Sequence, residues 1–268
     1  MLLLKKEPNR QMPTKDVSMK ITEYIKKEKE KIQGKPPKER LEYIWDYYKW
    51  PILGVILAIA ILVQGVIGIC NRKDIVFTGV VLNCKLGTKE DAFLEGFYEM
   101  AGIDAKKETA SFYTDIILQK GQNQLNANSI QRIMAGIVIK DMDFIAGTTD
   151  PFQLCAYSSG NMLGDLRNFL DQDTLQKLEG RLYYIDKAVW DQVNAPLGEH
   201  VEPDLLKYPD PHNPEDMVEP IPVGIDVSDR EAFINAYYLP DSRVYIGIVP
   251  NTPRLELVLQ FIDYLLES

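Results

Sequence analysis

The chain has 268 residues and a formal net charge of −9, and this charge is divided unevenly. Residues 1–50 carry thirteen Lys or Arg against eight Asp or Glu, whereas residues 51–268 have a net charge of −14. A segment this acidic repels phosphates, which argues against a nucleic-acid partner. Three cysteines are too few to build a disulfide scaffold in a chain of this length. Two of them, Cys84 and Cys155, either form one bridge or stay as thiols.

The N-terminal segment divides into a tail and two helices. Residues 1–18 contain two prolines and no sustained hydrophobic period, which predicts a disordered tail. Residues 19–50 predict cytoplasmic amphipathic and juxtamembrane helices, interrupted at Pro36 and Pro37. Translation starts either at Met1 or at Met19, which opens the first helix. The thin apolar stripe of this helix is typical of a solvated surface, with a partner helix as the alternative.

Aromatic residues crowd the end of the second helix. Leu41, Ile44, Trp45 and Tyr48 recur at helical spacing and form one apolar face. Amphipathic rings prefer the headgroup level of a bilayer, so the segment predicts an interfacial helix that turns into the membrane near Pro51. Binding of a cytoplasmic partner is the alternative. The expected membrane-anchor residues are Trp45, Tyr47, Tyr48 and Trp50.

Residues 51–70 predict a transmembrane helix. Ile52–Cys70 has nineteen residues with no charge and one polar side chain, Gln64. About 20 helical residues at roughly 1.5 Å each match a hydrocarbon core of about 30 Å. The long lead and the long apolar run favour an uncleaved anchor over a signal peptide, and Ile69 is too large for a lipoprotein motif at Cys70.

The basic tail sets the expected orientation. Short segments rich in Lys and Arg stay in the cytoplasm, whereas a long domain crosses the membrane largely regardless of its charge. We therefore expect a single-pass protein of the cell membrane with its N-terminus in the cytoplasm and its C-terminal domain, residues 74–268, extracytoplasmic.

Beyond the span, strands and helices alternate. The order β-α-β-α-β is the signature of a parallel sheet covered by helices. The expected fold class is therefore α/β, with one transmembrane helix followed by a three-layer α/β domain that has a mainly parallel sheet. The predicted elements are strands at 75–82, 111–118 and 142–147 and helices at 89–101 and 130–141.

The second half is less regular. Seven prolines in residues 194–222 predict a loop, and an amphipathic pattern predicts a closing helix at 254–267. The other predicted elements are helices at 151–158, 187–193 and around 230–238 and strands at 181–186 and 243–250.

The proline-rich loop also gathers the two histidines of the chain and several carboxylates. The histidines are twelve residues apart, and no spacing matches a helical zinc pair or a calcium loop. We interpret the segment as an exposed acidic loop and expect no metal and no cofactor. Its polar residues are Glu199, His200, Glu202, Asp204, Asp210, His212, Glu215 and Asp216.

No motif in the sequence indicates catalysis. It has no nucleophile elbow, phosphate-binding loop or dinucleotide fingerprint, so we expect no catalytic residues and no enzyme. Acidic residues that flank element boundaries favour caps and turns over a glycosidase-type pair. These pairs are Asp141 and Asp143, Asp171 and Asp173, and Asp226 and Asp229.

Three segments resemble known families. Residues 135–186, with the stretch LGDLRNFLD at 163–171, resemble the region of extracytoplasmic solute-binding proteins where a ligand-facing loop precedes the crossing between lobes. Residues 243–266 are similar to their returning strand and final helix. RLEYIWDYYKWPI, residues 40–52, resembles uncharacterised single-pass membrane proteins of Gram-positive anaerobes. The resemblance implies a reduced periplasmic-binding-protein fold, with a second lobe of little more than residues 181–240.

A ligand cleft in such a fold is expected beyond the carboxyl ends of the parallel strands. The expected function is non-catalytic binding of a small solute or a partner protein at the outer membrane face. A scaffold or assembly subunit of a membrane complex is the alternative, and an extracytoplasmic hydrolase is the third. The candidate ligand-binding residues, each otherwise a cap, turn or core residue, are Asn83, Thr148, Thr149, Asp150, Tyr183, Tyr184 and Asn251.

Overall fold

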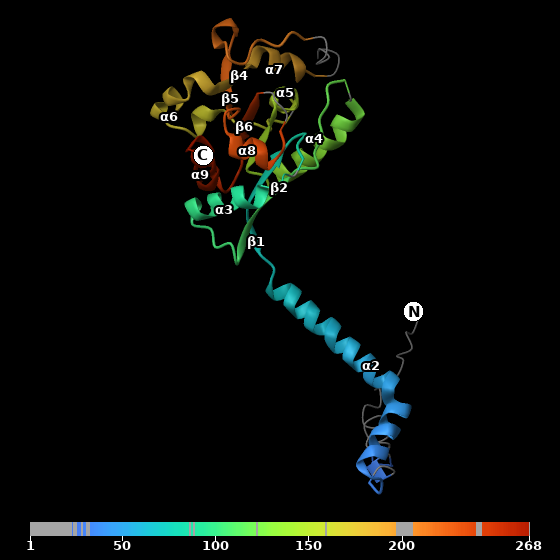
Figure 1. The fold of residues 1–268 in the computed structure, drawn as a ribbon. Helices are drawn as coiled ribbons and strands as arrows, with labels where there is room; N and C mark the ends of the chain where they lie inside the picture. Colours follow the sequence, from blue (N-terminus) through green and yellow to red (C-terminus); the bar gives the residue numbers. More distant parts are fainter. Residues whose placement is uncertain are drawn as a thin grey trace, which may run out of the picture. The chain divides into compact units, whose positions relative to one another are not determined.

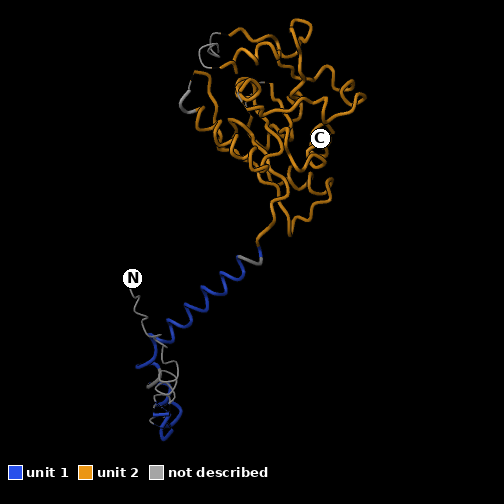
Figure 2. The backbone as a smooth tube through the Cα atoms, turned by 180° about the vertical axis from the view of Figure 1, so that it is seen from behind, with its two compact units in different colours: residues 1–71 blue, residues 72–268 orange. Residues whose placement is uncertain are grey.

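The structure is a computed structural model in which the chain forms two compact units, residues 1–71 and residues 72–268 (Figure 2). The tail predicted at 1–18 lies outside the described residues, and the five described residues of the helix predicted after it are helical. The structure describes residues 23, 26–27, 29–30, 33–85, 87, 89–121, 123–158, 160–196, 206–239 and 243–267.

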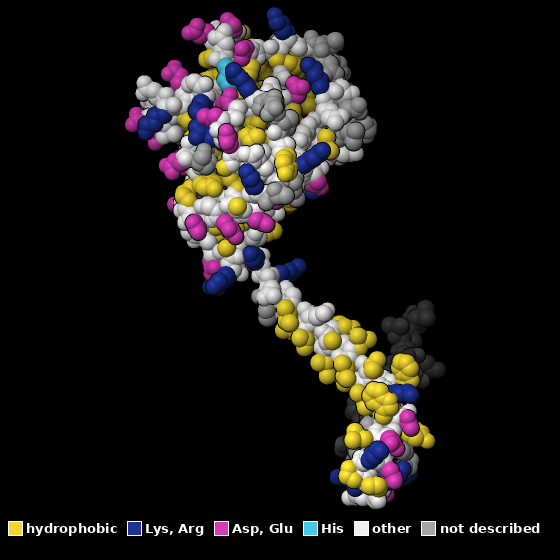
Figure 3. Space-filling model, in the orientation of Figure 1, with side chains coloured by type: hydrophobic (Ala, Val, Ile, Leu, Met, Phe, Trp, Pro, Cys, Tyr) yellow, Lys and Arg dark blue, Asp and Glu magenta, His cyan; other side chains and the backbone are white. Residues whose placement is uncertain are grey.

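The first unit is dominated by α2, a helix of 34 residues from Pro37 to Cys70 (Figure 1). Trp45–Gly68 is the one helical stretch in the described part of the chain that is long and apolar enough to cross a membrane, with a mean hydropathy of 2.4. Hydrophobic side chains cover its surface (Figure 3).

The interfacial segment and the span form one helix. α2 is continuous through Pro51, where the proline lacks the N–H that would complete one intrahelical hydrogen bond. Of the expected anchor residues, Trp45, Tyr47 and Trp50 are exposed and Tyr48 is half-buried. The aromatic side chains therefore lie on the surface of the helix beside the apolar run, as an interfacial belt requires.

A six-stranded sheet is the centre of residues 72–268, with the strand order β2-β1-β3-β6-β5-β4. β1 is parallel to β2 and β3, whereas β6 is antiparallel to β3 and β5, and β4 is antiparallel to β5. The strands are β1 (Asp74–Val81), β2 (Glu108–Tyr113), β3 (Phe144–Thr148), β4 (Leu182–Asp186), β5 (Pro220–Asp226) and β6 (Val244–Ile248).

The predicted α/β class is confirmed, but the prediction of a mainly parallel sheet is wrong. β5 and β6 are joined through α8, whose six residues rise about 9 Å, less than half the length of β5. Such a connection does not carry the chain back along the sheet, so β6 re-enters from the end at which β5 leaves. β4 and β5, expected in a second lobe, extend the same sheet. A likeness to solute-binding proteins stays a prediction.

Helices cover both faces of the sheet. Side chains alternate between two apolar clusters along each strand: in β6, Val244, Ile246 and Ile248 lie on one face and Tyr245 on the other. α3, α6, α8 and α9 pack on the first face, and α4, α5 and α7 on the second, which gives three layers. These helices are α3 (Glu90–Ala101), α4 (Asn123–Val138), α5 (Thr149–Ala156), α6 (Gln172–Lys177), α7 (Lys187–Val193), α8 (Glu231–Ala236) and α9 (Leu255–Glu267).

Aromatic rings form the centre of the first cluster. The ring of Phe261, from α9, lies 4.9 Å from that of Phe144, 5.0 Å from that of Phe97 and 5.3 Å from that of Phe77. Phe144 also lies against the backbone of Gly79, where a Cβ atom would come within 2.1 Å of the ring. The helix α9 therefore packs on the sheet through the Phe144 ring, and this ring has room only because residue 79 is glycine.

One buried carboxylate joins three parts of the sheet. Asp143 is fully buried just before β3, and both of its carboxylate oxygens accept hydrogen bonds. Arg254 Nε donates to both oxygens at 2.9 Å, and the backbone N–H of Thr78 donates to Oδ2 at 2.7 Å. Thr252 Oγ1 donates a further bond at 2.6 Å, and Val249 N–H donates to the Asp143 carbonyl at 3.0 Å. Asp143, expected to be a turn residue, therefore anchors the segment after β6 to β1 and β3.

Replacing Asp143 by Asn should lower the free energy of unfolding by about 3 kcal/mol, because it leaves the Arg254 charge without its close partner. Chemical denaturation of the full chain in detergent micelles, followed by circular dichroism, measures this loss. Asp141→Asn is the control: its carboxylate is 3.9 Å from Arg254 and 45 % exposed, so its loss should stay within about 0.5 kcal/mol. Equal losses in the two variants would contradict the role given to Asp143.

Candidate functional site

The ladder between β5 and β6 is short. The two strands pair at Ile225–Ile246 and Asp226–Tyr245, and the carbonyl of Ile248 instead accepts a hydrogen bond from Gly164 N–H at 2.8 Å. Beyond Ile248 the chain is bound to Asp143 on the β3 side, while β5 stays paired with β4. A pocket lies beside β5 and is lined by residues of β4, β5 and α7, by the segment 160–169 and by Pro250 after β6.

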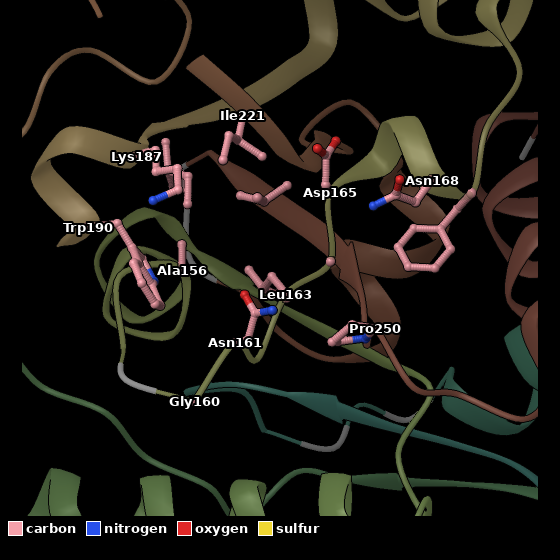
Figure 4. Close-up of a pocket in the computed structure, with 14 residues that line it drawn as sticks. Ala156, Gly160, Asn161, Leu163, Asp165, Asn168, Lys187, Trp190, Ile221 and Pro250 are labelled. Atoms are coloured by element: carbon pink, nitrogen blue, oxygen red, sulfur yellow. The ribbon is translucent and has the colours of Figure 1, made fainter. Parts of the chain in front are cut away.

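This β5–β6 pocket has a volume of about 730 Å³, within the range of about 300–1,000 Å³ usual for small-molecule sites (Figure 4). Its wall is mainly apolar, with a few polar side chains. It is lined by Ala156, Gly160, Asn161, Leu163, Gly164, Asp165, Asn168, Phe169, Ile185, Lys187, Trp190, Ile221, Val223 and Pro250.

A tight turn brings the segment 160–169 to the pocket. Gly160 has a φ of 122° and Asn161 a φ of 54°, a conformation that glycine and asparagine adopt most readily. A Cβ atom on Gly160 would also come within 2.3 Å of Met134 Cε, so the turn packs closely on α4. The turn leaves the Asn161 side chain exposed at the pocket.

Three polar groups of the pocket are without a hydrogen-bond partner among the described residues. The amides of Asn161 and Asn168 and the indole N–H of Trp190 form no hydrogen bond within the described part of the chain. Each amide offers two N–H donors and one carbonyl acceptor, and the indole offers one donor. Trp190 is half-buried and adds a flat apolar face.

The charged groups at the pocket are paired. Arg167 Nε donates to both carboxylate oxygens of Asp165 at 2.9 and 3.0 Å, and its Nη2 donates to one of them at 2.6 Å. Lys187 Nζ donates to Asp191 at 2.6 and 2.7 Å. Hydrogen bonds to these carboxylates raise the pKa of Arg167 and the pKa of Lys187. The pocket lining therefore carries no unpaired charge among the described residues.

A second buried carboxylate, Asp186, fixes the position of α7, the helix that contributes Lys187 and Trp190 to the pocket wall. Asp186, 4 % exposed, accepts hydrogen bonds from the backbone N–H groups of Ala188 at 3.0 Å, Val218 at 2.9 Å and Glu219 at 3.1 Å. It thereby caps α7 and ties that helix to the segment that enters β5. Burial raises the pKa of Asp186, but the three N–H donors outweigh this effect and hold its pKa below the usual value.

Of the residues expected at the ends of β1 and β3, Asn83 is held by hydrogen bonds to the backbone. Asn83 donates through Nδ2 to Leu118 O at 2.7 Å and accepts from Leu118 N–H at 2.8 Å. The strand predicted at 111–118 thus ends at Tyr113, and side-chain hydrogen bonds of Asn83 hold the chain at Leu118 in place of strand pairing. Thr148 is buried before α5, Thr149 is half-buried and Asp150 is exposed. These four residues share one edge of the sheet, because β1 and β3 are parallel.

The other expected site residues do not join them in one cleft. Tyr183 is 2 % exposed and contacts the rings of Phe152 and Tyr245, whereas Tyr184 lies on the opposite face, as alternate strand residues must. β6 is antiparallel to β3, so Asn251 lies at the opposite edge of the sheet, where its Nδ2 donates to Ile137 O at 2.8 Å. None of the seven residues lines the β5–β6 pocket.

The edge expected to hold a ligand carries a network around His212. His212 Nε2 lies 3.0 Å from Tyr245 Oη and 4.0 Å from Asp226 Oδ2, and Arg243 Nη1 lies 3.9 Å from the same carboxylate. Burial, followed by the charge of Arg243, lowers the pKa of His212. These groups satisfy one another, and we assign the network a structural role.

Two further expectations concern metals and cysteines. Glu199, His200, Glu202 and Asp204 lie outside the described residues, and among the described ones no group of three His, Cys, Asp or Glu is suited to hold a metal. Cys84 and Cys155 are both free thiols.

The pocket residues with free polar groups, Asn161, Asn168 and Trp190, were not among the expected site residues. Five of the fourteen lining residues belong to the stretch 163–171, which is part of the longer segment, 135–186, that resembles solute-binding proteins. The Gly160-Asn161 pair is the local signal for the turn that precedes this stretch, since both residue types favour tight turns.

Comparison with family models, curated proteins and solved structures finds no match for this chain. The fold and the site define a mixed α/β domain that follows one helix long and apolar enough to cross a membrane.

Replacing Asp186 by Asn should lower the free energy of unfolding by about 1–3 kcal/mol at pH 7, because one backbone N–H loses its acceptor and the others lose a charged one. The folded-state pKa lies below the unfolded value of about 3.9, so the stabilisation is present above that value and is lost as pH falls through the folded pKa. The difference between wild type and variant should therefore shrink on acidification below about pH 4.

Unfolding free energies measured from pH 7 down to about pH 3 test this expectation. Asp173→Asn, at an exposed position in α6, is the control and should follow the wild type throughout. A difference between wild type and the Asp186 variant that stays constant over the whole range would show that the charge of Asp186 is not involved.

Proposed function

We propose that this chain is a single-pass, membrane-anchored protein whose C-terminal α/β domain binds a small solute without transforming it. The observation that carries the proposal is the β5–β6 pocket, which has the volume of a small-molecule site and three hydrogen-bonding groups without partners in the described residues. Preformed apolar walls with a few oriented polar groups are typical of ligand sites.

The chemistry of the pocket supports binding over catalysis. Its acid and its amine are each engaged by an opposite charge at 2.6 Å, so neither is poised for proton transfer or attack. Burial raises the pKa of both free thiols, Cys84 and Cys155, to about 12, which keeps them protonated and unreactive at neutral pH.

The membrane assignment is supported by α2 and by the charge of the tail. Trp45–Gly68 supplies a spanning helix, and thirteen Lys or Arg in residues 1–50 favour a cytoplasmic N-terminus. In this proposal the acidic domain that follows is extracytoplasmic. It is derived from a solute-binding protein in which the second lobe has been reduced to β4 and β5, now part of the same sheet.

An assembly subunit is the competing proposal. Val138 and Ile139, at the end of α4, are each 71 % exposed, and Val218 is 83 % exposed. Exposed apolar side chains are typical of surfaces that bind another protein. In that case the pocket is incidental, and binding of a membrane-protein partner is the function.

A bulky side chain in the pocket should abolish solute binding. Ile221 is half-buried on the pocket wall, so Ile221→Trp fills the space while the strand is kept. Val218→Trp, two residues before β5 and exposed, is the matched control. Thermal unfolding of the full chain, with a panel of sugars, amino acids, short peptides and organic acids, provides the measurement.

At least one solute should stabilise the wild type and the Val218 variant, by about 2.7 kcal/mol at a concentration 100 times its Kd, and should leave the Ile221 variant unchanged. Indifference of the wild type to the whole panel would count against the binding module and for the assembly subunit.

Reporter fusions test the orientation. A reporter placed before Trp45 should be active only in its cytoplasmic form, and one placed after Asp74 only in its extracytoplasmic form, because the basic tail is retained inside. A cytoplasmic reporter after Asp74 would overturn the extracytoplasmic assignment.

A further inference from the structure

The pocket is unsuited to a charged ligand. A carboxylate or an ammonium group buried beside Asp165 or Lys187 needs an opposite charge to offset its loss of hydration. The charges that could supply it are already held by Arg167 and Asp191 at 2.6 Å. A charged ligand would have to break one of these pairs, whereas an uncharged ligand leaves both intact.

The free groups of the pocket match hydroxyl groups. Asn161 and Asn168 each present donors and an acceptor, and a hydroxyl is at once a donor and an acceptor, so it can satisfy either side of an amide. The indole N–H of Trp190 adds a donor that a hydroxyl oxygen can accept. A ligand with several hydroxyls offers a matching partner to each of these three groups.

The same wall presents an apolar surface. Trp190 lines the pocket together with Ile185, Ile221 and Leu163 (Figure 4), and Lys187 Nζ lies 5.9 Å from the centroid of its ring. A flat ring face of this kind contacts C–H groups favourably while its N–H stays available for a hydrogen bond. A solute with one C–H face and a rim of hydroxyls fits this combination.

We propose that the β5–β6 pocket takes an uncharged, hydroxyl-bearing solute with one apolar face, which is the chemistry of a neutral sugar. This assignment rests on the proposed function and names its class of ligand. Uncharged amides share part of this chemistry, but their donor and acceptor are separate atoms, whereas a single hydroxyl oxygen both donates and accepts.

A matched ligand series tests the assignment. Glucose and maltose are compared with glucosamine and glucuronate, which add one positive or one negative charge, and with an uncharged dipeptide amide. Binding to the full chain is measured by calorimetry in lipid nanodiscs, which avoids detergents with sugar headgroups. A neutral sugar should bind, and each charged analogue should bind at least about tenfold more weakly.

Two variants test the reason for this preference. Asp191→Asn frees the ammonium of Lys187 in the pocket, so the affinity for glucuronate should rise about tenfold while that for the neutral sugar changes little. Asp115→Asn breaks an exposed pair with Arg132 at 2.6 Å outside the pocket and should change neither affinity.

An error in the proposed class of ligand and an error in the proposed function give different results in these experiments. Charged analogues that bind the wild type as tightly as neutral sugars would overturn the class, as would no binding of neutral sugars at about 10 mM, tenfold above a Kd of about 1 mM. If another solute binds and Ile221→Trp abolishes its binding, the class is wrong and the proposed function stands. If nothing in either panel binds, both are wrong.

Discussion

The buried carboxylate of Asp143 determines where the sheet opens. Removed from water, it needs several donors, and it finds them in Arg254, Thr252 and the backbone of Thr78. The segment after β6 is thereby bound to β1 and β3 and does not continue beside β5. Gly164 N–H donates to the carbonyl of Ile248 at the end of β6, and Gly164 is itself one of the residues that line the β5–β6 pocket.

A second carboxylate repeats this arrangement on the other side of the pocket. Asp186 collects three backbone N–H groups and joins α7, which carries Lys187 and Trp190, to the start of β5. Both walls are thus held by groups buried beneath the surface. The pocket's own charges are neutralised in pairs, which leaves amides and an indole to face a ligand. A site held in place before binding loses little conformational freedom when a ligand enters, so it favours affinity.

The elements with a clear hydrophobic period could be predicted, because the period reflects the face that each one buries. β1, β4 and α9 lie within a few residues of their expected positions, and α3 ends at Gly102 with a φ of 70°. Strand direction leaves no such trace in local sequence, so a mainly parallel sheet was expected, and the antiparallel direction of β6 and the position of Asn251 at the other edge of the sheet were not. The pocket depends on two carboxylates that act over 109 and 32 residues of chain separation, and on a loop without a period.

The chain contains a direct reporter of whether a solute occupies the β5–β6 pocket. Of the three tryptophans, Trp190 lines the pocket, whereas Trp45 and Trp50 lie in α2. NMR spectra of the full chain in nanodiscs, with ¹⁵N-labelled indole groups, resolve the three N–H signals during titration with a neutral sugar. If a sugar enters the pocket, the Trp190 signal should shift and saturate while the other two signals stay unmoved. A Trp190 signal that stays fixed up to saturating sugar, or three signals that move together, would contradict binding of the sugar in this pocket.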